Sequence, residues 1–277
     1  MGNKSVKDIS RKDFASINPW IIDEGTVIGR EKMPVVCFVT RANMLHFLEV
    51  FVHRKFNFNV VDHAGNTPLH YAAEKKTPEL VDRMLEMGLS ATQTNNRKQS
   101  PLLVAVFMKR YHNIKPLAEA MFLTDDKGNG PIHYAIRASD ESMVRLLMAN
   151  TPELSWWHVA QGYTDPREYH LNYFCDVGAF SPLGLTVILL KYDMALCLID
   201  MGADKSSECN GKTPKSILAH IGTNLLYGGV FPTKRCTREE VLRMWSILTQ
   251  DIDVYRNIDA GATGFTGLVT GVHKYLS

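Results

Sequence analysis

The chain has 277 residues, of which 45% are hydrophobic and 22% are charged, an ordinary balance for a folded soluble protein. Its 31 basic and 29 acidic side chains leave a formal charge of +2, so there is no global field to recruit nucleic acid or an anionic membrane. The longest apolar stretches, such as 195–199 and 35–39, are far too short to span a bilayer.

The beginning of the chain lacks the apolar core of a secretory signal. The five cysteines are scattered without a CxxC pair or a Cys/His cluster: Cys37, Cys175, Cys197, Cys209 and Cys236. This pattern predicts neither a disulfide framework nor a zinc site, and it favours a reducing, cytoplasmic compartment.

The first predicted helix follows an N-terminal segment, residues 1–39. Thr40 supplies a hydroxyl at its start, and apolar residues continue at helical spacing through Phe51. We interpret residues 40–61 as a capping half-unit, because a helical array needs an end that covers its outer core face.

Residues 62–88 predict a polar turn followed by two helices. Thr67 suits an N-cap, because its hydroxyl can accept a hydrogen bond from an unpaired backbone N–H. Pro68 then stands at the first helical position, where its missing N–H costs nothing. Pro78 repeats this logic for a second helix, and Gly88 suits the left-handed conformation that ends it.

The same plan returns along the chain at spacings near 33 residues. Its later starts are Ser100-Pro101, Gly130-Pro131, Ser181-Pro182 and Thr213-Pro214, at intervals of 33, 30, 51 and 32 residues. Together with the Thr67-Pro68-Leu69-His70 core, these spacings resemble the ankyrin repeat. The resemblance implies about five degenerate repeats over 40–221. It also implies an all-α solenoid of helix-turn-helix units with short hairpin turns and helical caps.

The array departs from the ankyrin pattern in several places. Only the first copy carries the full motif, and the second unit is three residues short, which we assign to its second helix or hairpin near 121–126. An aromatic insert at about 151–175 contains Trp156 and Trp157. It is too aromatic for a solvated linker, so it either packs on the solenoid or forms part of a binding surface.

Residues 222–277 are predicted to form a C-terminal capping helix and a glycine-rich tail. Residues 237–240 read as a capping box that opens a helix running to about Leu248, with an apolar face suited to docking on the last repeat. We make no structural prediction for the tail.

No catalytic residue, metal ligand or cofactor is predicted. The resemblance implies that His70 and His133 are structural hydrogen-bonding hubs. Cys175 follows an insert that holds His158 and His170, but no cysteine-enzyme signature surrounds it, and the chain is not expected to be an enzyme.

A protein partner is the expected ligand. In the ankyrin family, partners usually contact a concave face made by hairpin tips and first-helix ends. The matching positions, with the two insert tryptophans, are His63, Asn66, Glu74, Lys75, Arg97, Gln99, Phe107, Met108, Lys127, Asn129, Arg137, Phe180, Ile188, Leu189, Trp156 and Trp157. The apolar members of this set either mark an interface or are buried by the insert or the C-terminal segment.

We therefore predict a monomeric, non-enzymatic interaction module that binds neither nucleic acid nor a cofactor. The irregular repeats are similar to those of ankyrin effectors that intracellular bacteria secrete, by type IV systems, into the host cytosol, where they act on host proteins. The alternative is an effector with a small enzymatic or regulatory activity in the insert or C-terminal segment, the repeats serving for targeting. The sequence does not name the partner, since one scaffold serves many targets.

Overall fold

The computed structural model describes residues 8–9, 14, 16–174, 180–226 and 238–249. The chain divides into two compact units, residues 1–131 and 132–277. Each unit is described by itself below.

The first unit opens with a small sheet and a short helical turn. Strand β1 (Asp8–Ile9) pairs parallel with β2 (Val27–Ile28), and β2 pairs antiparallel with β3 (Met33–Pro34). The short helical turn η1 (Pro19–Ile21) comes between β1 and β2 in the sequence. The sequence predicts only helices, and this sheet escapes prediction because strands of two residues are too short to show a period.

A complete helix pair follows: α2 (Val35–Arg41) and α3 (Leu45–His53). The predicted half-repeat at 40–61 is therefore wrong, since its first helix begins at Val35 and Thr40 lies inside it. The Thr40 hydroxyl donates to the Val36 carbonyl at 2.8 Å, so it caps nothing. The first helix escaped prediction because it starts directly after Pro34 without a capping side chain and has no polar face to give a helical period.

The pairs that follow match the predicted plan. Helix α4 (Pro68–Ala73) pairs with α5 (Pro78–Glu86), and α6 (Pro101–Phe107) packs beside α4. After α6, two short turns, η2 (Tyr111–Asn113) and η3 (Ala118–Ala120), stand where a second helix is expected. The repeat that begins with α6 is therefore shortened at its second helix.

In the first unit, the hairpins between successive helix pairs share one hydrogen-bonding pattern. Asp62, Asn95 and Asp125 each accept backbone N–H bonds from the residues two and four positions on, at 2.8–3.0 Å. Such side-chain-to-backbone bonds form a tight turn without a sheet. The turn requires a left-handed residue, which is Gly65 in the first hairpin (φ +79°) and Lys98 in the second (φ +55°).

The second unit contains the insert and the last helix pairs. Its helices are α7 (Pro131–Arg137), α8 (Glu141–Ala149), α9 (Trp156–Ala160), α10 (Pro166–Glu168), the π-helical η4 (Tyr169–Tyr173), α11 (Pro182–Ile188), α12 (Tyr192–Asp200), α13 (Pro214–Leu226) and α14 (Arg238–Thr249). Helix α11 packs on α12 and α13, and α14 packs on both α12 and α13.

Helix α14 lies where the sequence predicts a C-terminal capping helix. Its residues Val241, Leu242 and Met244 are buried, and the Lys205 ammonium donates to the carbonyl of Ile247 at 2.8 Å. Thr237, the predicted cap, and the glycine-rich tail lie outside the described residues. Among those residues, no helix is both long and apolar enough to cross a bilayer.

Replacing Lys98 by glycine is expected to raise the free energy of unfolding by about 0.5 kcal/mol, because an exposed lysine in the left-handed region is strained and glycine is not. Urea titration of the full chain measures the change.

Gly65→Ala, at the equivalent hairpin position, supplies the opposite control. An added Cβ would lie 2.5 Å from Oδ1 of Asn96, so this variant is expected to lose roughly 2 kcal/mol. If the two substitutions changed stability in the same direction, backbone strain would not be the determinant of these turns.

Candidate protein-binding surfaces

The hairpin tips of the first unit are held in register by backbone hydrogen bonds. The Asn96 N–H donates to Ala64 at 3.0 Å, and the Asp126 N–H donates to Arg97 at 2.9 Å. His63, Arg97 and Lys127 are exposed on these tips. The structure therefore brings these three predicted residues onto neighbouring, mutually fixed turns, with a basic character set by Arg97 and Lys127.

Three other predicted residues serve the hairpins themselves. The Asn95 amide donates both to Oδ1 of Asn66 at 2.9 Å and to Oε1 of Gln99 at 3.2 Å, and Asn129 is buried. The amide oxygens of Asn66 and Gln99 thus accept hydrogen bonds within the hairpins, and the Asn129 side chain is covered. Because a buried side chain offers nothing to a partner, we leave Asn129 out of the surface proposed below.

The end of α4 is fixed by side chains from the following repeat, within the first unit. The Asn113 amide donates to the carbonyls of Ala73 and Lys75 at 3.0 and 2.9 Å, and the Arg110 guanidinium donates to Glu74 at 2.6 Å. These bonds satisfy carbonyls that a helix end leaves without partners. Sequence reasoning missed both donors, because they act from about 40 residues away. The side chains of Glu74 and Lys75 are half-buried.

At the end of α6, apolar side chains face solvent. Phe107 is 71% exposed, and Met108 and Tyr111 are also exposed. For Phe107, the structure therefore supports the first of the two alternatives, an apolar group on the surface. An exposed phenylalanine beside two further apolar side chains is typical of an interface.

The matching positions of the second unit are more covered. Arg137 is exposed, whereas Phe180, Ile188 and Leu189 are half-buried, and the Lys212 ammonium lies 4.6 Å from the centre of the Phe180 ring. This unit therefore presents less apolar surface at its first-helix ends than the sequence suggested.

One side of the aromatic insert is anchored in the second unit. Nε2 of His133 lies 3.0 Å from the Phe174 carbonyl, and Nδ1 of His170 lies 3.2 Å from the Thr151 hydroxyl. Asn172 accepts the Asp204 N–H at 2.9 Å, and η4 packs against α11. The insert is therefore anchored, because His170, Leu171 and Asn172 of η4 are buried in the unit.

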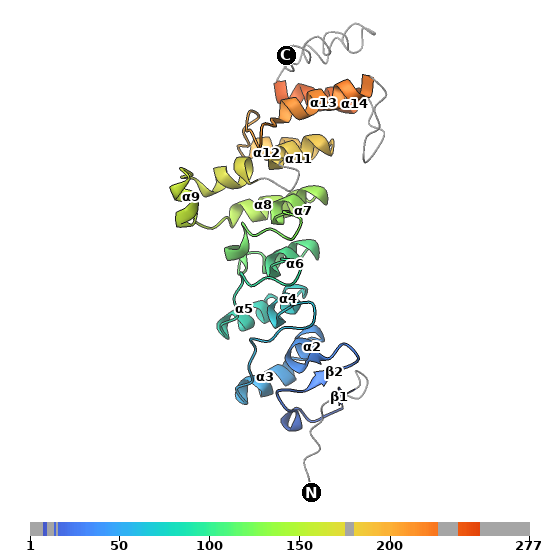
Figure 1. Cartoon of the computed structure of the whole chain (residues 1–277), viewed down its shortest axis with the longest axis vertical. Coiled ribbons are helices and arrows are strands. Elements are labelled where there is room, and N and C mark those ends of the chain that lie inside the picture. Colours follow the sequence, from blue (N-terminus) through green and yellow to red (C-terminus); the bar gives the residue numbers. More distant parts are fainter. Residues whose placement is uncertain (1–7, 10–13, 15, 175–179, 227–237, 250–277) are drawn as a thin grey trace. The chain divides into compact units, whose positions relative to one another are not determined.

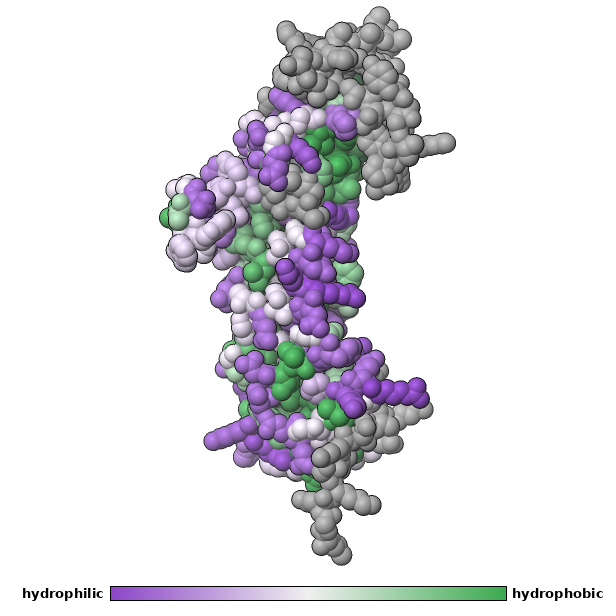
Figure 2. Space-filling view, in the orientation of Figure 1, coloured by the Kyte–Doolittle hydropathy of each residue, from purple (hydrophilic) through white to green (hydrophobic). Residues whose placement is uncertain are grey.

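The other side of the insert faces solvent. Figure 1 shows α9 standing out to the side of α7 and α8, and the projecting lobe is mostly pale in Figure 2. Trp156 is 80% exposed, Trp157 51% and Val159 57%, and α9 buries no residue. Trp156 and Val159 are three positions apart and therefore share one helix face.

Aromatic contacts connect this exposed helix to the buried half of the insert. The His158 ring lies 4.7 Å from Tyr169 and 5.2 Å from Trp157, and Tyr163 lies 4.7 and 5.1 Å from Tyr169 and Tyr173. The Ser155 hydroxyl lies 2.7 Å from Nδ1 of His158 at the start of α9. Three of the four ring contacts are edge-to-face and that of Tyr163 with Tyr173 is tilted; such contacts fix ring positions, so α9 is supported by the buried half of the insert.

The two histidines of the repeat motif are structural. Nδ1 of His70 accepts the Thr67 N–H at 3.1 Å, so Nε2 carries the ring proton and donates to the Gln99 carbonyl at 2.9 Å. Burial lowers the pKa of His70 and keeps the ring neutral. Among the described residues, no three His, Cys, Asp or Glu side chains gather closely enough to hold a metal ion.

The cysteines differ in part from the prediction. Cys37 and Cys197 are free and buried, and burial beside the Asp62 carboxylate raises the pKa of Cys37 to about 12, which makes it a poor nucleophile. Cys209, however, is disulfide-bonded, and its partner lies outside the described residues. The scattered cysteines along the chain give no indication of this bond. Cys175, the cysteine considered as a partner for His158 and His170, also lies outside them.

Comparison with known proteins identifies the repeat. A family model for ankyrin repeats, in three copies, matches residues 36–122. A crystal structure of the ankyrin repeat domain of Bcl-3, a member of the IkappaB protein family, is similar at a TM-score of 0.55 and 15% sequence identity. The alignment covers 76% of this chain and 92% of that one. At that identity, the likeness shows the fold.

Two curated proteins are similar in sequence. The chain is 27% identical over 101 residues to a transient receptor potential cation channel subfamily A member 1 homolog of Caenorhabditis elegans. It is 23% identical over 180 residues to the regulatory protein SWI4 of Saccharomyces cerevisiae. The matches take in 35% and 61% of this chain but only 8% and 16% of those proteins.

Acidification is expected to destabilise the second unit through His170. Complete burial, and secondarily the nearby His133, lower the pKa of His170 from 6.5 to about 3. Because the folded-state pKa is depressed, the stabilisation is complete above about pH 6.5 and is lost as the pH falls towards 3. The loss approaches about 1.4 kcal/mol per pH unit while only the unfolded state takes up the proton.

Urea unfolding of the full chain between about pH 7 and pH 5 measures this loss. His170→Gln should flatten the pH dependence, whereas the exposed control His112→Gln should leave it unchanged. A His170→Gln slope equal to that of the unmodified chain would assign the acid sensitivity elsewhere.

Proposed function

We propose that this chain binds a partner protein through the exposed aromatic side of its insert. The chain carries ankyrin repeats and has the ankyrin-repeat fold, and the ankyrin repeat is a general protein–protein interaction module. We name the exposed side of the insert the α9 knob and define it as Trp156, Trp157 and Val159. The observation that carries the proposal is the exposure of two adjacent tryptophans on a helix that buries none of its own residues.

The energetics of binding favour such a surface. Tryptophan is enriched among the few interface residues that carry most of the affinity, where truncation to alanine costs roughly 2 kcal/mol or more. The contacts of His158 and Tyr163 with Tyr169 support the helix before any partner arrives. A braced surface loses less conformational entropy on binding than a mobile loop, so more of the contact energy is available as affinity.

A second contact is proposed on the first unit. Phe107 and Met108 provide apolar area at the end of α6, and the tips that carry His63, Arg97 and Lys127 provide polar and basic groups. Exposed apolar groups together with charged groups are the usual composition of a protein interface. This contact is the one that the ankyrin resemblance suggests, whereas the α9 knob belongs to this chain in particular.

A role as a pathogen effector would make the partner a host protein. That proposal rests on the resemblance of the irregular, interrupted array to secreted ankyrin effectors. No observation on the described residues favours the enzymatic alternative. We therefore propose binding as the activity.

Trp156→Glu is expected to abolish capture of the partner by the immobilised full chain, with at least a tenfold loss of recovery, because a carboxylate cannot enter the pocket that receives the indole. Quantitative mass spectrometry of proteins retained from a cell lysate measures the loss. The folded state should be unaffected, since Trp156 is 80% exposed.

Trp20→Glu is the matched control, because Trp20 is also an exposed tryptophan but lies on η1 of the first unit. Phe107→Glu tests the second contact in the same experiment. Recovery of the same proteins by Trp156→Glu and by the unmodified chain would contradict a role for the α9 knob.

A further inference from the structure

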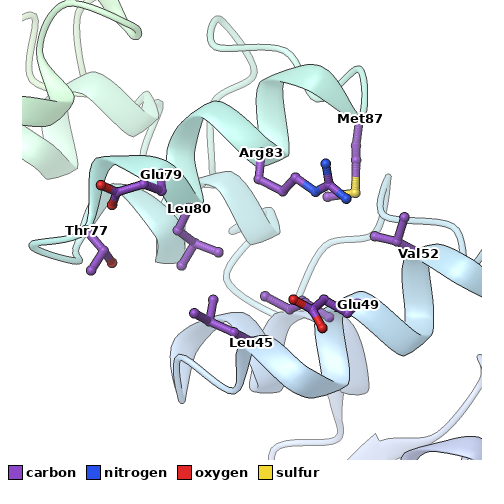
Figure 3. A pocket seen from close by; sticks show the side chains of 9 residues that line it. Leu45, Glu49, Val52, Thr77, Glu79, Leu80, Arg83 and Met87 are labelled. Atoms are coloured by element: carbon purple, nitrogen blue, oxygen red, sulfur yellow. The ribbon is translucent and has the colours of Figure 1, made fainter.

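A groove lies between the second helices of the first two pairs, α3 and α5, in the first unit. It has a volume of about 400 Å³, and Figure 3 shows the side chains that line it. They are Leu45, Leu48, Glu49, Val52, Thr77, Glu79, Leu80, Arg83 and Met87. None of these residues belongs to the predicted partner-binding set or to the α9 knob.

The groove runs along the two helices. Leu45 lies opposite Thr77 and Leu80 at one end, and Val52 lies opposite Met87 at the other (Figure 3). A second hollow of about 380 Å³ shares Val52 and Met87 with the first, so the depression continues beyond the ends of both helices. Each helix has nine residues and is therefore about 13 Å long, which matches roughly two to three turns of a bound helix.

The floor of the groove is apolar. Leu48 and Leu80 are buried beneath it, Val52 and Met87 are half-buried, and Leu45 is 53% exposed at its edge. The exposed Leu45 side chain makes no favourable interaction with water, whereas a bound apolar side chain would bury it. The floor thus offers a row of aliphatic contacts along the helix direction.

The charged residues at the margin are not equivalent. Arg83 is paired with Glu86 at 3.4 Å, whereas Glu49 and Glu79 have no hydrogen-bond or ion-pair partner among the residues that the structure describes. Two unpaired carboxylates therefore flank an apolar floor. Since the whole chain carries a formal charge of +2, their attraction for a basic ligand is local and not a consequence of net charge.

The helices on either side of the groove restrict the backbone conformation of a ligand. Both walls are helices whose backbone groups already bond within the helix, so they offer no free edge to an extended strand. A helix satisfies its own backbone hydrogen bonds, so it can lie along these walls without such an edge. A second copy of the chain could offer its exposed apolar helix α9 to the groove. Helix α9 contains no lysine or arginine to pair with the glutamates, which argues against a second copy as the occupant.

We propose that the α3–α5 groove binds a basic amphipathic helix of a partner protein, with aliphatic side chains on the floor and lysine or arginine beside Glu49 and Glu79. This surface is separate from the α9 knob and its role does not depend on it. It would give the chain a second protein-binding site on the second-helix side of its first unit.

The probe is a fluorescein-labelled 14-residue helical peptide of leucine, alanine and lysine, with leucines on one face. A matched peptide carries glutamate in place of lysine. Fluorescence anisotropy with the full chain at low salt is expected to give at least tenfold tighter binding of the lysine peptide. Leu45→Gln should weaken that binding at least fivefold, and the double variant Glu49→Lys/Glu79→Lys should reverse the preference to the glutamate peptide.

Trp156→Glu should bind the lysine peptide as tightly as the unmodified chain, which separates this site from the α9 knob. Thermal melts confirm that each variant is folded. Equal binding of both peptides, or unchanged binding by Leu45→Gln, would overturn the proposal. A dimer in sedimentation that Leu45→Gln disperses would also overturn it, because the occupant would then be a second copy of the chain.

Discussion

In the two copies that carry a motif histidine, a hydrogen bond joins that histidine to a backbone carbonyl beyond its own helix pair. In the first unit, His70 donates from Nε2 to Gln99, the residue directly before the next helix cap. The bond fixes the distance between successive pairs, and its donor is oriented by Thr67 on the other ring nitrogen. Because the ring is buried and neutral, this contact is also sensitive to protonation.

The insert uses the same contact in the second unit. The residue equivalent to Gln99 would be Phe180, directly before Ser181, but His133 instead meets the Phe174 carbonyl at the end of the insert. The insert therefore occupies a place that a hairpin holds elsewhere. This explains why one half of it is buried while the other half stands out as the α9 knob.

Near two of the copies that lack the histidine, the described residues make other polar contacts. Asn113 bonds the carbonyls at the end of α4, and Thr213 and Ser216 exchange hydrogen bonds at the start of α13. At Gly184, an added Cβ would lie 3.0 Å from Ile217, so the small residue permits close packing of α11 on α13. The irregular copies are thus held by specific contacts, and they leave room for surfaces that a regular array would lack.

The sequence by itself determined the repeat, its caps and its last helix, because a hydroxyl, a proline and an apolar period are local signals. The aromatic residues of the insert were visible in the sequence in the same way. Tertiary structure alone decided that α2 completes the first pair, that Asn129 is buried and that the insert has two unlike sides. It also formed the α3–α5 groove, whose residues come from two helices about 30 positions apart. No local pattern reports on such pairings, because they depend on which helix faces which.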